Sequence, residues 1–407
     1  MNRRTFLVTA AAGATQLGRA QSGFSEGLRN LKPMTDGIQP ITEGERRARI
    51  AKAQRLMMEN KIDAIVLESG TSMYYFTGTR GIAGDRWFGL ILPARGEGAF
   101  IVPDNAHSSA RLITDVRAAK TDADAYGIAA QFLKDRGIGR IGIEERARFA
   151  VFDGLRHQAP SAEFVSADTV TAGCRMIKSP SEIALMQRAS DITIAAYKVA
   201  LAHLQEGMTQ QDLSANIAAA YHALGVAGNA MAIFGKYTAF PHGSIQPQQL
   251  REGDMVLIDD GCSVEGYQSD ITRTTVFGKP TARQREIWNL ERKAQDAAFA
   301  AAKVGATCES VDAAARKVIT DAGFGPDYKV PGLPHRTGHG IGLDGHEWTY
   351  LVRGNQTRIR PGMCFSDEPT IAIYGEFGVR LEDCMYITED GPRMFSKPSP
   401  AIDQPFG

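Results

Sequence analysis

Acidic side chains end two apolar, strand-like runs in the second half of the chain, and a further acid follows each run. The first set is Asp259, Asp260 and Asp270, and the second set is Asp367, Glu368 and Glu382. If the residues around each set form neighbouring strands, the carboxylates come close together and repel one another unless a cation lies between them. One such set alone would more often be a structural turn. Two sets in matching places favour a metal site.

Histidines gather between the two acidic sets. His335, His339 and His346 lie within 12 residues, although the whole chain has only eight histidines. The glycines around His339 predict a tight, close-packed backbone rather than a solvated surface. Four carboxylates with one imidazole make a hard, oxygen-rich site, which favours Mn²⁺, with Zn²⁺ or Co²⁺ as alternatives, over soft metals.

The elements that must position these residues repeat themselves. A long helical pattern that ends near Gly207 is followed by a shorter one that closes at Gly225, and the same order recurs 98 residues later at Gly305 and Gly323. Each helix pair precedes a histidine-bearing loop and then an acid-ended strand, and His242 is the histidine of the first loop. This shared order predicts a duplicated half-domain whose seam collects ligands from both halves.

A separate domain is predicted before this repeat. Short apolar runs at residues 63–69, 88–94, 98–104 and 140–145 alternate with helical patterns, which is typical of an α/β domain that ends near Cys174. Ser179-Pro180-Ser181-Glu182 then has the residues of a capped helix start and marks the boundary of the second domain.

Length and composition agree with two globular domains. The chain has 407 residues and a formal net charge of zero, so nothing indicates a nucleic acid or an anionic membrane as partner. No apolar run is long enough to span a bilayer. A basic start with paired Arg3 and Arg4, a weakly apolar stretch and small residues up to Ala20 predict a twin-arginine signal peptide over residues 1–20, and hence export to the periplasm without a membrane anchor after cleavage. The five cysteines have no CxxC spacing, and Cys262, Cys364 and Cys384, in or beside apolar runs, are interpreted as small core residues rather than ligands or bridges.

On these motifs, residues 179–388 resemble the catalytic domain of the creatinase/aminopeptidase P/prolidase family, the pita-bread metallopeptidases. Residues before Cys174 resemble that family's N-terminal domain, with weaker motifs. The resemblance implies an α/β N-terminal domain over residues 37–174, followed by an α+β pita-bread catalytic domain over residues 175–407 with an internal pseudo-twofold repeat.

The resemblance also implies roles for individual residues. It makes Asp259, Asp270, His339, Glu368 and Glu382 the ligands of two metals, with Asp270 and Glu382 as bridges. It assigns the substrate site to His242, His335, His346 and Arg380, and His242, His346 and Glu368 are the predicted catalytic residues. The implied reaction is hydrolysis of small Xaa-Pro peptides, as a dipeptidase or an aminopeptidase, by a hydroxide that bridges the two metals. The open alternatives are another metal-dependent C–N hydrolase that acts on a small amide and a non-catalytic binding protein. We also expect a homodimer.

The chain departs from the family pattern around the pocket. Thr370 follows Glu368-Pro369 where the family usually has glycine, and Thr349 stands where a proline often follows the last histidine of the loop. The segment of residues 232–236, ahead of His242, is also unusual. These departures concern the substrate pocket more than the metal ligands.

Overall fold

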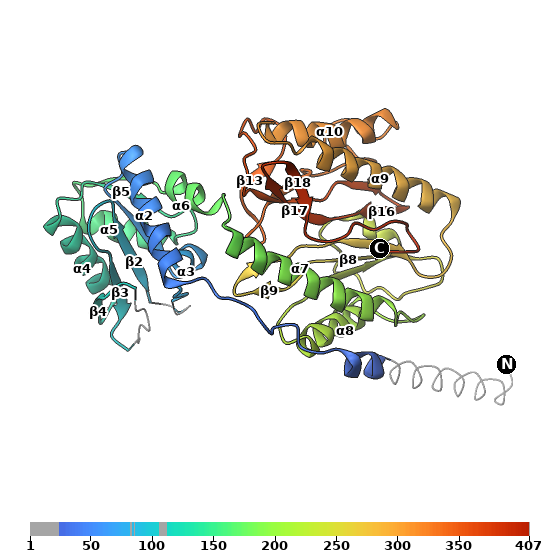
Figure 1. The fold of residues 1–407 in the computed structure, drawn as a ribbon, viewed down its shortest axis with the longest axis horizontal. Coiled ribbons are helices and arrows are strands. Elements are labelled where there is room, and N and C mark those ends of the chain that lie inside the picture. Colours follow the sequence, from blue (N-terminus) through green and yellow to red (C-terminus); the bar gives the residue numbers. More distant parts are fainter. Residues whose placement is uncertain (1–23, 82–83, 85, 106–111, 407) are drawn as a thin grey trace. The chain divides into compact units, whose positions relative to one another are not determined.

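The computed structural model describes residues 24–81, 84, 86–105 and 112–406 (Figure 1). The signal peptide expected over residues 1–20 lies outside the described residues. The chain divides into two compact units, Pro40–Ile177 and Lys178–Gly407, and residues 24–39 belong with the second unit. Within the described part of the chain, no helix has both the length and the apolar character needed to cross a membrane.

The first unit is built on one mixed sheet with the strand order β4-β3-β2-β1-β5-β6. Its strands are β1 (Ala64–Glu68), β2 (Gly89–Pro93), β3 (Ala99–Pro103), β4 (Asp115–Ala119), β5 (Arg140–Ile143) and β6 (Glu163–Ser166). Its helices are α2 (Glu43–Glu59), α3 (Thr71–Thr77), α4 (Asp122–Asp135), α5 (Phe149–Gln158) and α6 (Asp168–Arg175). The three central strands β1, β2 and β3 are buried along their whole length, which is why they read as continuous apolar runs. The α/β character predicted for this domain is confirmed.

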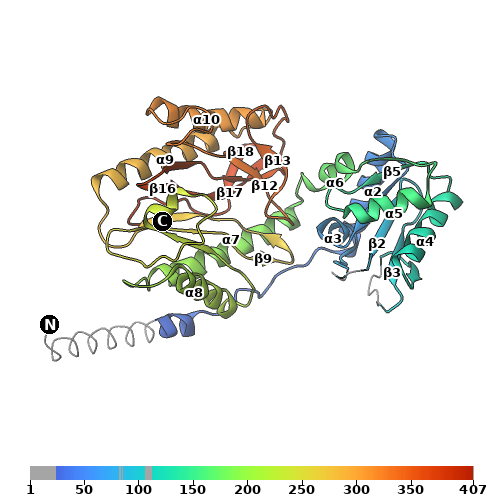
Figure 2. The same cartoon turned by 180° about the vertical axis from the view of Figure 1, so that it is seen from behind.

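The second unit contains four long helices and three main groups of strands. The helices are α7 (Pro180–Leu201), α8 (Gln210–Ala223), α9 (Ala282–Ala301) and α10 (Cys308–Asp321), with the 3-10 helix η1 (Gly235–Ala239). The strands are β7 (Met231–Phe234), β8 (Met255–Asp259), β9 (Ser263–Val264), β10 (Tyr267–Gln268), β11 (Arg273–Val276), β12 (Gly338–Gly340), β13 (Glu347–Leu351), β14 (Cys364–Asp367), β15 (Thr370–Ile373), β16 (Phe377–Arg380), β17 (Asp383–Thr388) and β18 (Gly391–Met394). In Figures 1 and 2, α9 and α10 lie along one side of the strands and α8 lies along the opposite side.

The predicted internal repeat is present in the backbone. Gly207 and Gly305 both have positive φ, and Thr209 and Thr307 both cap the shorter helix of their pair. Gly207 donates its backbone N–H to Leu250. In the second half, Gly305 donates in the same way to Ile359. The duplicated order predicted from the sequence therefore corresponds to a pseudo-twofold repeat of helix pair and strands.

The first long helix of the second domain was predicted too long at its C-terminal end. The helix that starts at the Ser179–Glu182 capping box ends at Leu201, and Gly207 lies beyond it in the turn that leads into α8. The start of the helix matches the prediction because Ser179 accepts from Glu182 N and Glu182 returns a hydrogen bond to Ser179 N.

The strands place the acidic residues at corresponding ends of two sheets. Strand β8 lies in the middle of the order β11-β8-β7, and β14 lies in the middle of β13-β12-β14-β17-β18. Asp259 is the last residue of β8, and Glu368 follows directly after β14. Because β8 and β14 each have neighbours on both sides, their ends are held firmly and the acids that follow them are fixed in space.

Candidate metal centre

All nine site residues predicted from the sequence line one pocket of about 540 Å³. They are His242, Asp259, Asp270, His335, His339, His346, Glu368, Arg380 and Glu382. The same pocket is lined by residues that the sequence did not single out as site residues, among them Asp260, Arg336 and Tyr328.

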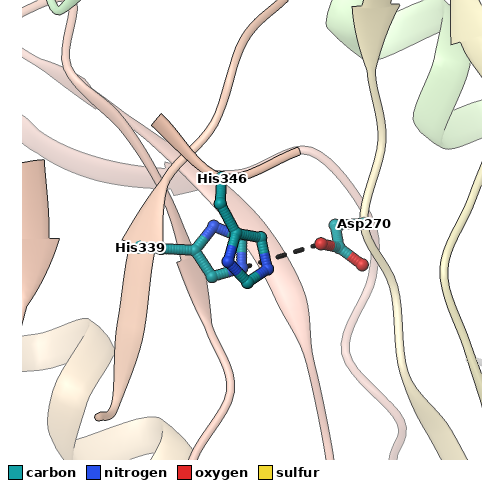
Figure 3. Close-up of side chains that lie close together, drawn as sticks. All are labelled: Asp270, His339 and His346. Carbon is teal, nitrogen blue, oxygen red and sulfur yellow. Dashed lines mark ion pairs between the residues drawn. The ribbon is translucent and has the colours of Figure 1, made fainter. Parts of the chain in front are cut away.

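The five predicted metal ligands fall into overlapping groups whose donor atoms lie within 4.8 Å of one another. One group is Asp259, Asp270 and Glu382, and a second is His339, Glu368 and Glu382. A third group joins Asp270 to His339 and His346 (Figure 3). Asp270 and Glu382 each occur in two groups, so their positions suit carboxylates shared between neighbouring cations.

The hydrogen bonds of His339 test whether a cation fits. Its Nδ1 lies 3.1 Å from the backbone oxygen of Gly340, which can only accept, so Nδ1 carries the proton. Burial, with the nearby His346 ring, lowers the pKa of His339 to about 3, so the ring is neutral and Nε2 has a lone pair. That lone pair lies 3.2 Å from Glu368 Oε1 and 3.6 Å from Asp270 Oδ2. Acceptors that face one another in this way are satisfied by a shared proton or by a cation between them, and a divalent cation would serve all three groups at once.

The carboxylates show the same excess of negative charge. Burial, together with repulsion from neighbouring acids, raises the pKa of Asp270 and Glu382 well above their ordinary values. Burial is also the main cause that raises the pKa of Glu368 to about 7. Glu382 Oε1 is buried without a hydrogen-bond partner among the described residues. The donor set therefore fits divalent metal ions, which would neutralise the acids and satisfy this oxygen.

Thr272 connects two of these carboxylates and was not predicted. Its Oγ1 lies 2.7 Å from Asp259 Oδ1 and 2.7 Å from Glu382 Oε2, so one hydroxyl joins acids from the two halves of the repeat. Arg380 Nε donates to the same oxygen at 3.1 Å. The sequence did contain a signal, because Thr272 lies two residues after Asp270 and alternate residues of an extended chain face the same side.

We expect Thr272→Val to weaken metal binding while keeping the shape of the side chain. Partners that orient metal ligands contribute about 10- to 100-fold to metal affinity or activity. Metal titration and kcat/KM should both show a loss in that range, and Thr272→Ser, which keeps the hydroxyl, should stay near the parent protein. Equal metal affinity in the valine and serine variants would contradict this role.

Arg380 contacts the site from the other side. Its guanidinium forms a close ion pair with Asp259 and donates through Nη1 to the backbone oxygen of Pro241 at 3.0 Å. The charge of Arg380 and the hydrogen bond from Thr272 keep the pKa of Asp259 below its ordinary value, although burial opposes this shift. Arg380, which was predicted as a substrate-site residue, lines the pocket, and the acid that it contacts is Asp259.

The histidines line different parts of the pocket. The ring of His346 stacks on that of His339 with centroids 3.8 Å apart, as Figure 3 shows. Arg336 Nη2 lies 2.7 Å from His346 Nδ1, and because a guanidinium can only donate, the neutral His346 ring carries its proton on Nε2. His242 is exposed at the rim, where the pocket continues into a second hollow lined by Met231 and Gln210.

A buried ion pair on α10 holds the histidine loop in place. Asp312 accepts from the backbone and the hydroxyl of Thr337, and its partner Arg316 donates to the backbone oxygens of Leu333 and His335. Because both charges are buried and satisfied, the loop is fixed on the side away from the pocket.

A second buried pair lies behind the acids. Arg273 donates to the backbone oxygens of Thr272 and Glu382 and pairs with Asp383 at 2.7 Å. Asp383 therefore faces away from the pocket, and Asp367 is not among the lining residues either. Asp367–Glu368 and Glu382–Asp383 are pairs of adjacent acids. Only Glu368 and Glu382 of these four residues line the pocket.

Comparison with known proteins agrees with this geometry. Residues 184–389 match the metallopeptidase family M24, and residues 49–177 match the creatinase/prolidase N-terminal domain. An Xaa-Pro dipeptidase of Pyrococcus furiosus is 32% identical over 86% of this chain and 97% of the relative.

Two solved structures are also similar. The dipeptidase PepE of Mycobacterium ulcerans has a TM-score of 0.81 at 29% identity and covers 88% of this chain and 97% of its own. A dipeptidase of Pyrococcus horikoshii has a TM-score of 0.79 at 30% identity and covers 86% of this chain and 98% of its own.

The fold and the site together define a two-domain metallopeptidase of the pita-bread type. The chain belongs to metallopeptidase family M24, and it is a hydrolase that uses divalent metal ions.

Proposed function

We propose that this protein hydrolyses Xaa-Pro peptide bonds and that dipeptides are its main substrates. The observation that carries the proposal is the neutral His339 ring whose lone pair faces Glu368 and Asp270 inside a closed set of acids. Relatives named as Xaa-Pro dipeptidases, which match over nearly their whole length, support the choice of substrate.

The metal ligands in this proposal are Asp259, Asp270, His339, Glu368 and Glu382, with Asp270 and Glu382 shared between two ions. Bound divalent ions would lower the pKa of a water molecule and polarise the scissile carbonyl. The many carboxylate oxygens favour Mn²⁺ as the native ion over softer metals.

The side chains in and around the ligand set have separate roles in proton transfer and in stabilising the oxyanion. Glu368 would take the proton of the attacking water and pass it to the leaving nitrogen, because it lies in the ligand group with His339 and Glu382 and burial raises its pKa to about 7. His346 donates its Nε2 proton to the oxyanion that forms on the carbonyl, and His242 at the rim is the second candidate donor.

Substrate recognition falls to Arg380 and His335 in this proposal. Arg380 uses three of its five N–H groups on Asp259, Thr272 and Pro241, and the guanidinium still has two for a substrate carboxylate. In a dipeptide, that carboxylate lies one residue beyond the scissile bond. Export to the periplasm and assembly as a homodimer stay predictions of the sequence.

The test is a substrate panel with Mn²⁺ present: Xaa-Pro dipeptides, longer Xaa-Pro peptides and small amides. Cleavage of the dipeptides is the expected result. Exclusive activity on longer peptides would assign an aminopeptidase, exclusive activity on small amides would assign another C–N hydrolase, and no hydrolysis at all would leave a binding protein.

Arg380→Leu tests the recognition of the carboxylate. A hydrogen bond to a charged group is worth roughly 1.5–3 kcal/mol, so kcat/KM on Xaa-Pro dipeptides should fall about tenfold to a hundredfold. The same dipeptides with an amidated C-terminus should lose much less. An equal loss on both kinds of substrate together with loss of metal would assign Arg380 to the support of Asp259 instead.

A further inference from the structure

Thr370 lies behind the pocket, in contact with His335, which is one of the lining residues. It is the first residue of β15, and its partner across the strand pair is Arg380 at the end of β16. Directly opposed residues of an antiparallel pair have their side chains on the same face. Thr370 is buried, with 1% of its surface exposed, so it does not itself present a surface to a ligand.

The hydroxyl of Thr370 is bonded to His335. Thr370 Oγ1 lies 3.0 Å from His335 Nε2, and His335 Nδ1 lies 2.7 Å from the backbone oxygen of Arg336. The backbone oxygen can only accept, so the ring proton is on Nδ1 and Nε2 must accept. The Thr370 hydroxyl therefore donates to Nε2. Burial, aided by the charge of Arg380, lowers the pKa of His335 to about 3, which agrees with a neutral ring.

Both nitrogens of His335 are thus occupied by the protein itself. The ring lines the same pocket as Arg380 and His242, but it offers an entering substrate neither a free donor nor a free acceptor. A glycine at position 370 would leave Nε2 as a buried acceptor without this partner. A substrate group with an N–H or O–H donor would gain a hydrogen bond to such an acceptor.

We infer that Thr370 is a positioning residue that, through His335, sharpens the preference for proline after the scissile bond. The inference rests on the proposed function, in which this side of the pocket surrounds the second residue of the substrate. Proline has no backbone N–H and loses nothing beside a ring that is already satisfied. Any other residue brings an N–H and gains no partner from His335.

The kinetic test compares Thr370→Val with Thr370→Ser on matched Xaa-Pro and Xaa-Ala dipeptides. Valine keeps the shape without the hydroxyl, and serine keeps the hydroxyl. We expect the ratio of kcat/KM for Xaa-Pro over Xaa-Ala to fall roughly two- to tenfold in Thr370→Val, the scale of one hydrogen bond, with most of the change in KM. The serine variant should keep the parent ratio. Metal content is measured in each variant because Glu368 is only two residues away.

A spectroscopic measurement follows the ring directly. Nitrogen-15 NMR of the zinc-loaded protein should show the parent and Thr370→Ser with His335 protonated on Nδ1 and with a hydrogen bond to Nε2. In Thr370→Val the Nε2 resonance should shift as this bond is lost. An unchanged His335 signal, an unchanged substrate ratio, or a serine variant that behaves like valine would overturn the inference.

The two proposals fail in different ways. If the parent protein hydrolyses neither dipeptide, the proposed function fails, whatever the NMR shows. If the parent cleaves Xaa-Pro and Thr370→Val leaves the substrate ratio unchanged, the proposed function stands and the role of Thr370 is refuted.

Discussion

Replacing Asp270 by alanine should remove both metal ions from the protein, not one. Asp270 belongs to two of the ligand groups, one with Asp259 and Glu382 and one with His339 and His346. Loss of a partner that only orients a ligand costs about 10- to 100-fold in metal affinity, so loss of a shared ligand should cost more than about a hundredfold at each site. Elemental analysis after dialysis measures the occupancy, and kcat/KM should fall in parallel.

Two variants serve as controls for this result. His339→Ala should empty mainly one site, because Nδ1 is bonded to Gly340 and only Nε2 can bind a metal, so this ring serves one ion. Asp260→Asn should keep both ions, because Asp260 is outside all three ligand groups and accepts from Met231 N. A full pair of ions in Asp270→Ala would refute the shared position of this carboxylate.

The two domains and the repeat were predictable because their signals are local. The sequence signal of each feature lies within a few residues. This is true of a glycine with positive φ, of a threonine cap with its partner three residues later, and of a buried apolar strand. Gly207 and Gly305, with Thr209 and Thr307, made the duplication visible before any contact was known. The convergence of the four acids and His339 on one pocket follows from that duplication.

Contacts between distant residues were not predictable in the same way. Thr272 meets Glu382 across 110 residues, and Arg380 meets Asp259 across 121, and only the packing of the two halves brings these side chains together. The spacing of Arg380 from Glu382 indicates a shared face, but it does not indicate which acid the guanidinium reaches. Strand β4 was missed because its exposed and buried residues alternate and include charged side chains, so it has no apolar run.

The same reasoning explains why Thr370 could be noted but not interpreted. The sequence shows a threonine in place of glycine, and only the folded chain shows His335 within hydrogen-bonding distance of its hydroxyl. The position of His335 in the fold therefore links Thr370, two residues after the predicted ligand Glu368, to the choice of substrate.

The adjacent carboxyl Asp367 provides a matched control for the catalytic role of Glu368. Both residues are acids at the end of β14, but Glu368 lines the pocket and Asp367 does not. Burial raises the pKa of Asp367 well above its ordinary value, which favours the uncharged acid, and asparagine is uncharged and of the same shape. Asp367→Asn should therefore keep kcat near that of the parent protein.

Glu368→Gln should lower kcat by about 10²- to 10⁴-fold, the usual contribution of a positioned acid–base group, because an amide cannot take up and return a proton. Glu368 Oε1 also lies 3.2 Å from His339 Nε2, so the substitution changes a predicted metal ligand as well as the acid–base group. The metal content of the variant is therefore measured before its activity. At full metal occupancy, reached with added Mn²⁺ if needed, the loss in kcat should persist while KM changes little. Recovery of the parent kcat on saturation with metal would restrict Glu368 to metal binding and assign the proton transfer to another group.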